Sequence, residues 1–296
     1  MKKAFTLVEL LVVVAIIGVL AGVLMGTFSG GTESARAARC LSNMKNLASA
    51  SQTYGMKTGH YPYAGSYLRM HLDTSKGRTQ GKAKMSYTEL PGWISWDSRG
   101  CKNQSAGTDV GLYSTNEDAA RYALTNGCLW SYVSQNAQTY LCPSHVKKSG
   151  QTPPNWSYLM NGKAFGAGNS KPISTKTHVG QEYGSLARAD RILLFSEVPF
   201  MGYSDWQPDG EGAGTDTDAV LKYNSSETIG ANHTNGKLLL AHVVFADGHA
   251  EKLRIPYSGS IKKPKAEADQ LKNLTQWLCE GKDLSFDGSQ YQKMTN

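Results

Sequence analysis

The sequence predicts an α+β protein in which one long N-terminal helix, transmembrane in its first half and amphipathic in its second, packs on a small antiparallel β-sheet head with long loops. Three observations predict this class. An apolar run opens the chain at 5–28, apolar residues at helical spacing follow at 35–54, and two apolar segments flank Asp247-Gly248. A chain of 296 residues is long enough for one or two packed domains.

The composition excludes two other classes of protein. Charged residues make up 19% of the chain and the formal net charge is +7, with 15 tyrosines. An intrinsically disordered chain would have fewer aromatic residues and more net charge. A polytopic membrane protein would need several apolar runs, and only 5–28 is apolar enough to span a bilayer. We therefore expect a folded head and a single membrane span.

The apolar run from Phe5 to Phe28 contains one charged residue, Glu9, and no proline. At a rise of 1.5 Å per residue, about 20 residues cover the roughly 30 Å hydrocarbon core of a bilayer. Backbone groups in lipid must be satisfied within the segment, which favours a helix in spite of its many valines. Lys2 and Lys3 place the amino end in the cytoplasm by the positive-inside rule. We therefore expect a single-pass inner-membrane protein with a periplasmic head.

A removable secretory signal peptide is the alternative interpretation of this run. Its apolar region would be about 7–15 residues long and would end at a small-residue cleavage site, and this run is longer. Glu9 lies near the start of the run. A carboxylate in a membrane helix costs up to about 3 kcal/mol and usually has a specific partner. A retained helix whose acid has a partner fits both observations better.

The segment KAFTLVE at 3–9, with the apolar run after it, resembles the processing and methylation segment of type IV pilins and type II secretion pseudopilins. The resemblance implies that a prepilin peptidase cleaves between Ala4 and Phe5 and N-methylates Phe5. It also implies that Glu9 neutralises the terminal amine of a neighbouring subunit during assembly, which fits the cost of burying either charge alone. The family usually has Gly before the cut, so we expect slower processing at Ala4.

An amphipathic stalk helix is expected at 29–58, after the membrane span. Gly30-Gly31 interrupts the pattern between the two segments and is either a hinge or a close-packing point. If the helix bridges this pair, 5–54 form one rod of about 75 Å. The chain then divides into a leader at 1–4, a transmembrane and assembly helix at 5–28, the stalk and a head at 59–296. The predicted buried face of the stalk consists of Ala35, Ala38, Leu41, Met44, Leu47, Ala48, Ser51 and Tyr54.

The head is expected to consist mostly of strands and loops. Residues 191–195 predict a short buried strand, and 238–246 with 249–255 predict a hairpin, because an Asp-Gly pair between apolar runs is a strong turn signal. The Gly- and Ser-rich segments 99–116 and 202–219 predict surface loops.

Pieces of the stalk and head resemble one large pseudopilin-like family, typical of planctomycete and verrucomicrobial chains and named for a His…Asp-Gly element. Here the spacing from His233 to Asp247 is longer than the usual one, which leaves a shared role of the two residues open. Residues 64–120 match no segment of this family. The matching pieces are CLSNMKNL at 40–47, GCLWSYV at 127–133 with YLCPS at 140–144, SYLMN at 157–161, and His233 with VFADGH at 244–249.

The five cysteines are disulfide candidates, since an oxidising periplasm favours bridges and an odd number leaves at least one unpaired. A Cys128–Cys142 bridge would close a loop of about 15 residues and contribute roughly 3 kcal/mol. The second resemblance makes Cys40–Cys142 an equally good pair. No two cysteines have the Cys-x-x-Cys spacing, which argues against zinc. The candidates are Cys40, Cys101, Cys128, Cys142 and Cys279.

An acidic segment at 205–218 is a candidate Ca²⁺ site. Counted from its first Asp, positions one, three, five and twelve carry oxygen ligands and position six is Gly, as in an EF-hand loop. Major pseudopilins of type II secretion often hold calcium in a late acidic loop, so the resemblance favours the ion. The stiff Pro208 and the missing flanking helices favour a solvated acidic turn instead. The candidate ligands are Asp205, Gln207, Asp209, Glu211, Asp216 and Asp218.

Other candidate sites carry less weight. His233, His242, Asp247 and His249 could form a metal or acid–base cluster, but a turn Asp is expected for backbone reasons, which assigns the last two to a turn. The sequence shows no nucleophile with its base and no Gly-rich phosphate loop, so we do not expect an enzyme. The basic stretches 69–84 and 262–265 lack interleaved aromatic residues, so nucleic acid is not an expected partner.

The sequence therefore predicts a structural filament subunit, assembled into a type II secretion pseudopilus. The resemblance implies three kinds of partner: self and sibling pseudopilins, the prepilin peptidase and an inner-membrane assembly platform. The first alternative is a surface type IV pilus subunit, in an extracellular filament, with a role in adhesion or DNA uptake. A membrane-tethered hydrolase is a lesser alternative.

Overall fold

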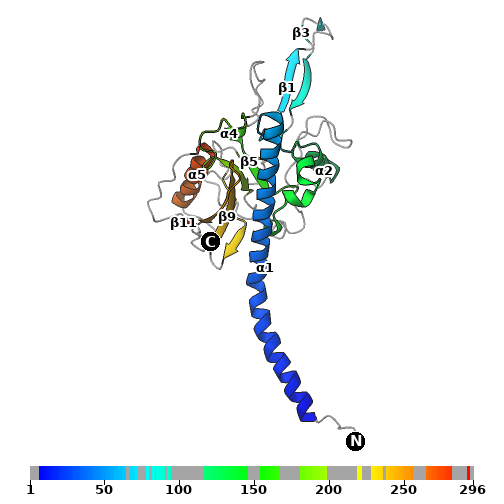
Figure 1. Ribbon diagram of the computed structural model, residues 1–296, viewed down its shortest axis with the longest axis vertical. Helices are drawn as coiled ribbons and strands as arrows, with labels where there is room; N and C mark the ends of the chain where they lie inside the picture. Colours follow the sequence, from blue (N-terminus) through cyan, green and yellow to red (C-terminus); the bar gives the residue numbers. More distant parts are fainter. Residues whose placement is uncertain are drawn as a thin grey trace.

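One long helix carries a mixed α/β head on its carboxyl-terminal half (Figure 1). The computed structural model describes residues 7–64, 67–72, 78–79, 82–83, 85–90, 92–94, 117–145, 154–166, 181–198, 219–221, 228–235, 238–255, 265–281 and 292–293. The predicted α+β class fits this architecture.

Helix α1 (Leu7–Thr58) is continuous over 52 residues, a length of about 78 Å. The glycine pair at 30–31 does not break it, and a Cβ on Gly31 would meet no atom within 4 Å. The pair is therefore neither a break nor, at Gly31, a close-packing point within the chain. The helix ends where Gly59, at φ +82°, donates its N–H to the Gly55 carbonyl at 2.8 Å. Over the described residues, no helix has the length and hydropathy needed to cross a membrane.

The main sheet of the head has seven strands, in the order β11-β10-β9-β6-β5-β7 with β8 also paired to β9. All of its pairs are antiparallel except the pair of β5 and β7. The predicted hairpin is confirmed, since β9 and β10 pair around Asp247-Gly248, where Gly248 has φ +91°. The predicted strand at 191–195 is β6, which begins two residues later and continues to Glu197. The strands are β5 (Tyr158–Asn161), β6 (Leu193–Glu197), β7 (Val220–Leu221), β8 (His233–Asn235), β9 (Leu238–Phe245), β10 (Ala250–Ile255) and β11 (Gln292–Lys293).

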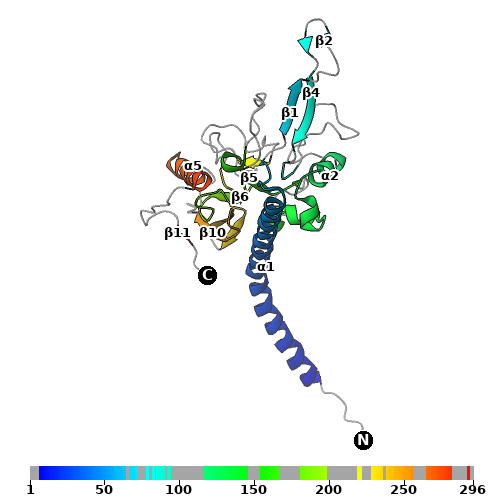
Figure 2. The ribbon, with the colours of Figure 1, turned by 45° about the horizontal axis from the view of Figure 1, so that its top comes forward.

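The segment 64–120, which matched no family piece, contributes two small hairpins. Strand β1 (Tyr67–Leu72) pairs with β4 (Met85–Leu90), and between them β2 (Arg78–Thr79) pairs with β3 (Lys82–Ala83). Figures 1 and 2 show that the β1–β4 hairpin projects beyond the end of α1.

Short helices complete the head on the two sides of α1. In both views α2 (Glu117–Thr125) lies on one side of α1, and α5 (Lys265–Glu280) and the sheet lie on the other (Figures 1 and 2). Helix α5 contacts β6 and α4 (Gly162–Phe165). The 3₁₀ turns η3 (Trp130–Val133) and η4 (Ala137–Tyr140) contact α1.

The second half of α1 forms part of the core, because one face of it packs on β6, β8, β9, β10, η3 and η4. Met44, Leu47, Ala48 and Ser51 are fully buried, as predicted. The predicted face is wrong at its amino end, where Ala35 and Ala38 are exposed. The buried face there instead passes through the following residues: Ala37, Cys40 and Asn43.

Candidate functional site

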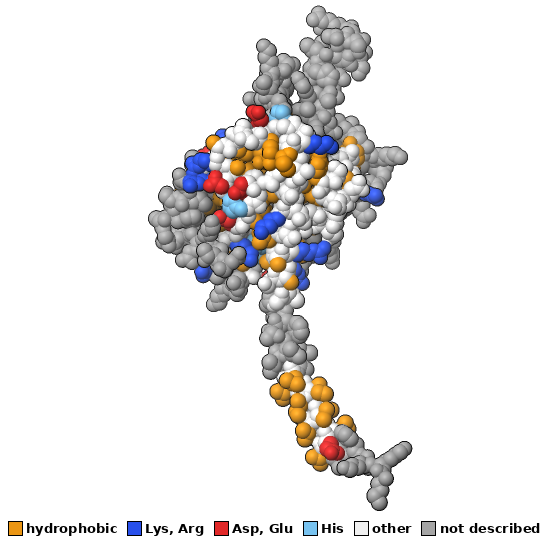
Figure 3. Space-filling view, in the orientation of Figure 1, with side chains coloured by type: hydrophobic (Ala, Val, Ile, Leu, Met, Phe, Trp, Pro, Cys, Tyr) orange, Lys and Arg blue, Asp and Glu red, His pale blue; other side chains and the backbone are white. Residues whose placement is uncertain are grey.

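The first half of α1 is an apolar rod with exposed side chains. The large apolar residues from Leu7 to Leu20 are 45% to 78% exposed, and Figure 3 shows hydrophobic side chains gathered along the lower part of the helix. Glu9 lies in the first turn of α1 and is also exposed. The predicted cleavage site at Ala4 and Phe5 lies outside the described residues, as does the acidic segment at 205–218.

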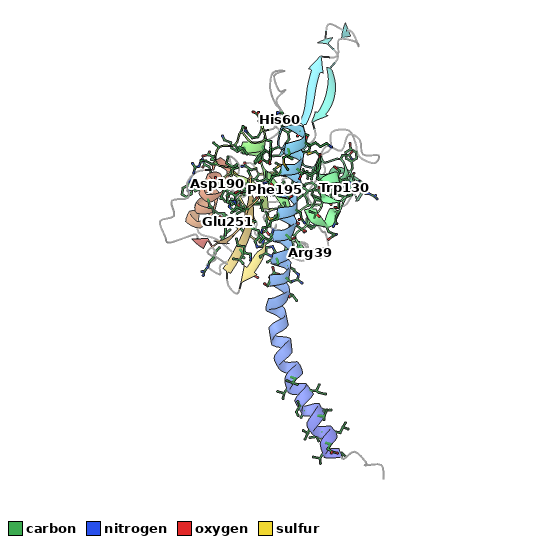
Figure 4. All side chains as sticks on the ribbon, in the orientation of Figure 1. Arg39, His60, Trp130, Asp190, Phe195 and Glu251 are labelled. Carbon is green, nitrogen blue, oxygen red and sulfur yellow. The ribbon has the colours of Figure 1, made fainter. Side chains whose placement is uncertain are left out.

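A second candidate site is buried where α1 meets the sheet. It consists of four side chains from four segments: Cys40 of α1, Cys142 two residues after η4, Glu197 at the end of β6 and His233 at the start of β8. All four residues are fully buried, and their ligand atoms lie within 4.8 Å of one another. We call these residues the buried cluster. Figure 4 shows the side chains of this region, with Phe195 of β6 labelled.

One carboxylate oxygen lies at the centre of the buried cluster. Glu197 Oε1 is 2.8 Å from Cys40 Sγ, 2.9 Å from His233 Nε2 and 3.9 Å from Cys142 Sγ. Cys142 Sγ is in turn 3.3 Å from His233 Nε2. Two sulfur atoms, one nitrogen and one oxygen therefore converge on one point of the core.

A further set of polar groups orients these four side chains. Glu33 Oε1 lies 3.1 Å from His233 Nδ1 and accepts a 2.6 Å hydrogen bond from Ser144 Oγ. Tyr158 Oη donates to Cys40 Sγ at 3.4 Å. His242 Nδ1 lies 3.1 Å from Glu197 Oε1. Glu33, Tyr158 and His242 each contact a residue of the buried cluster, and Ser144 holds Glu33 in place.

The local sequence explains how Cys40 and Cys142 come together. Cys40 and Asn43 are three residues apart on the buried face of α1. The Asn43 side-chain amide donates to the carbonyls of Gln138, at 3.0 Å, and Leu141, at 2.9 Å. Asn43 thus holds the residue that precedes Cys142 against the helix, one turn from Cys40.

The sheet brings in the other two residues of the buried cluster. All five residues of β6 are buried, and Glu197 is the last of them. The backbone N–H of Asn232 donates to Glu197 Oε2 at 3.2 Å, and the N–H of Gly230 donates to the Glu197 carbonyl at 2.8 Å. These bonds place His233, the next residue, beside the carboxylate.

The surroundings shift the pKa values of all four residues. Burial disfavours the charged form of Glu197, but His233 and His242 more than offset it and hold its pKa well below the usual range. Burial also disfavours the charged form of His233, which by itself lowers its pKa, but Glu197 and Cys142 outweigh burial and raise the pKa to about 11. Burial raises the pKa of Cys40 well above its usual value. For Cys142, burial is offset by the Cys40 and His233 side chains, which lower its pKa to about 7.

Glu33 is ionised for similar reasons. Burial raises its pKa, but the hydrogen bonds with Ser144 and His233 outweigh burial, so the pKa of this carboxyl lies below its usual value. Glu33 also forms a 3.4 Å ion pair with Arg36, one turn further along α1.

The chemistry of this donor set is that of a metal site. Thiolate, imidazole and carboxylate are the zinc ligands in proteins, and the buried cluster contains all three types. None of the four cysteines that the structure describes forms a disulfide: Cys40, Cys128, Cys142 and Cys279. Cys101 lies outside the described residues, and the disulfide pairs stay predictions.

The sequence singled out three residues of the buried cluster but did not predict that they lie together. Cys40, Cys142 and His233 each lie in a different matching piece, but Glu197 was missed because it ends an apolar run. The lack of a Cys-x-x-Cys pair does not exclude zinc here, because the thiols of Cys40 and Cys142 come from different elements and meet only in the fold. Asp247 and His249 belong to the turn, as predicted, since the His249 N–H donates to Asp247 Oδ1 at 3.0 Å.

Comparison with known proteins identifies the amino-terminal segment. Residues 1–25 match the family model described as the prokaryotic N-terminal methylation motif. No curated protein and no solved structure matches the chain. The matched residues include Ala4, Phe5, Glu9 and the whole exposed apolar rod from Leu7 to Leu20. The chain therefore carries the prepilin-type cleavage and methylation segment of type IV pilins and pseudopilins.

Proposed function

We propose that this protein is a pseudopilin, a subunit cleaved between Ala4 and Phe5, N-methylated on Phe5 and assembled into a type II secretion pseudopilus. The observation that carries the proposal is the combination of a methylation motif at 1–25 with an exposed apolar rod that projects from the head. Filament assembly and processing by a prepilin peptidase follow from the motif in general; the secretion role is the more specific proposal.

The exposed rod supports assembly on physical grounds. Exposing this much apolar surface to water is unfavourable. The rod must therefore be covered by lipid, by protein, or first by one and then by the other. We propose that the rod lies in the inner membrane before assembly and packs against the rods of neighbouring subunits afterwards. In this arrangement the amino end is cytoplasmic, the head is periplasmic, and an inner-membrane platform assembles the filament.

Glu9 supports a specific order within the filament. It is the only charged residue of the apolar run and lies in the first turn of α1. The cleaved amino terminus of a neighbouring subunit carries a positive charge. A buried carboxylate and a buried ammonium are each costly alone and are stabilised as a pair, so pairing selects subunits in the correct axial register.

A surface type IV pilus subunit is the second candidate. The β1–β4 hairpin favours it, because an element that projects beyond the end of α1 is available for contacts outside the filament wall (Figure 2). In this case the filament is extracellular.

Mass spectrometry of the mature amino terminus, combined with shearing of cells, tests the proposal. We expect N-methylated Phe5 in cells with the prepilin peptidase and an intact Met1 in cells without it. A pseudopilin stays with the sheared cells and its deletion blocks protein secretion, whereas a surface pilin is found in the sheared filament fraction. An unprocessed terminus in cells with active peptidase would contradict both candidates.

A further inference from the structure

We propose that the buried cluster is a structural zinc site, in which Cys40 Sγ, Cys142 Sγ, Glu197 Oε1 and His233 Nε2 are the four ligands and fix α1 to the head. The proposal does not depend on the proposed function, because it concerns how the stalk and head of one chain are joined.

The spacing of the four atoms fits a tetrahedral zinc ion. Zn–S distances of about 2.3 Å and Zn–N or Zn–O distances of about 2.0–2.2 Å place the ligand atoms of a tetrahedron about 3.3–3.8 Å apart. Four of the six separations between the ligand atoms of the buried cluster run from 2.8 to 3.9 Å, and all six are within 4.8 Å. Only small side-chain adjustments would therefore bring the four atoms to coordination distance.

The groups around the ligands are those of a metal site. A histidine that binds zinc through one ring nitrogen usually donates its other ring N–H to a carboxylate. His233 has this geometry, with Nε2 in the buried cluster and Nδ1 3.1 Å from Glu33 Oε1. The carboxylate of Glu33 is itself held by Ser144, and Cys40 Sγ accepts a bond from Tyr158. This arrangement is an independent observation, since Glu33, Ser144 and Tyr158 lie outside the four ligands.

Two metal-free explanations account for only part of the buried cluster. A Glu197–His233 ion pair explains two of the residues and leaves the thiols of Cys40 and Cys142 only as weak hydrogen-bond donors to the same carboxylate oxygen. A Cys40–Cys142 disulfide explains the two thiols and leaves the convergence of Glu197 and His233 on the sulfur atoms without a role. A zinc ion uses all four residues, and it compensates negative charge in a place where every ligand residue is fully buried.

The type of site follows from the burial and the ligand number. Four protein ligands complete the tetrahedron, and their full burial leaves no position for water or substrate, which is typical of structural and not of catalytic zinc. Binding releases to solvent the thiol protons of Cys40 and Cys142 and the Nε2 proton of His233, so the two sulfurs coordinate as thiolates and His233 coordinates as a neutral imidazole. The ion would join α1 to β6, β8 and the segment after η4 at one point.

The first test measures the metal in the full chain, purified in mild detergent after growth with zinc. We expect about one zinc per chain, and X-ray absorption at the zinc edge should show two sulfur neighbours at about 2.3 Å with nitrogen or oxygen completing the shell. This measurement needs no variant, so it decides the question even where variants fail to fold. Purification from cells without the prepilin peptidase keeps the result independent of processing and assembly.

Matched cysteine variants form the second test. Cys142→Ser should reduce the zinc content to near zero, whereas Cys279→Ser, a change at a buried cysteine outside the cluster, should leave it unchanged. Peptide mapping without reductant reports the redox state of the same thiols. A Cys40–Cys142 disulfide, metal-free thiols, or zinc without sulfur neighbours would each overturn the proposal.

Discussion

Cys40 Sγ and Glu197 Oε1 lie 2.8 Å apart in the core, although 157 residues separate them in the sequence. The first residue belongs to the helix that carries the methylation motif, and the second belongs to the central part of the head sheet. Their contact marks the place where the stalk and the head become one folded unit.

Replacing Glu9 by Ala should leave membrane insertion intact and reduce filament assembly, because the terminal amine of the neighbouring subunit loses its buried partner. Filament yield can be measured by microscopy and by pull-down of tagged subunits. Glu9→Gln keeps the size of the side chain and should show the same defect, and Lys45→Ala, on the exposed face of α1, serves as the control. Unchanged yield in both Glu9 variants would refute the pairing.

Replacing Asn43 by Ala should destabilise the head by about 1–3 kcal/mol, because the carbonyls of Gln138 and Leu141 lose their hydrogen-bond donor. Urea denaturation of the full chain in mild detergent, followed by tryptophan fluorescence, measures the change in the free energy of unfolding. Asn46→Ala is the matched control, because it lies three residues further on and is exposed. Equal midpoints for the two variants would contradict the role assigned to Asn43.

Replacing Glu197 by Ala should destabilise the protein by about 3–5 kcal/mol, because the buried His242 loses its carboxylate partner and the buried His233 keeps only Glu33. Urea denaturation followed by tryptophan fluorescence measures this change in the free energy of unfolding. Glu182→Ala, a change at an exposed acid, should shift the free energy of unfolding by less than about 0.5 kcal/mol. A Glu197 variant as stable as this control would show that the carboxylate has no structural role.

Replacing Glu33 by Gln should weaken zinc binding about 10- to 100-fold, because His233 loses the carboxylate that orients its ring. Competition with a chromophoric chelator measures the affinity. Arg36→Gln removes only a part-exposed partner of Glu33 and should change the affinity little. The prediction fails if Glu33→Gln binds zinc as tightly as the unchanged chain.

Calcium binding by the acidic segment 205–218 stays a prediction of the sequence. The protein is first stripped of all metal and then reloaded with zinc alone. Calcium added to this sample should raise the melting temperature of the head, and Asp209→Ala should abolish the increase. Reloading with zinc first separates the two ions, because the candidate calcium ligands are all oxygen atoms. Melting curves that do not respond to calcium would favour the solvated acidic turn.

The sequence predicted those parts of the fold that local patterns encode. The apolar run and the spacing of Met44, Leu47 and Ala48 predicted two helical segments, whose union into one rod across the glycine pair was left open. Asp247-Gly248 predicted the β9–β10 hairpin. The end of the buried face was misplaced because Ala35 and Ala38 are as compatible with helix as Ala37, and only the packing partner decides which of them is buried.

The buried cluster could not be predicted in the same way. Its contacts join residues 55, 91 and 157 positions apart, and no local spacing encodes such pairs. Glu197 follows Leu193, Leu194 and Phe195 in a strand, where an acidic residue is equally compatible with a solvent-exposed strand end. Only the pairing of β6 with β9, and the packing of α1 across the sheet, places its carboxylate beside two thiols and two imidazoles.

The unbroken course of α1 also has a mechanical consequence. Axial tension applied to the apolar end of the helix reaches the head without a flexible joint, since the glycine pair is helical. Among the residues of α1 whose burial the structure describes, Ala37 and Cys40 are the first buried ones that the force meets, so the load enters the head at the buried cluster. A subunit pulled from a membrane into a growing fibre would therefore resist shear first at this junction, ahead of the apolar contacts of Met44 and Leu47.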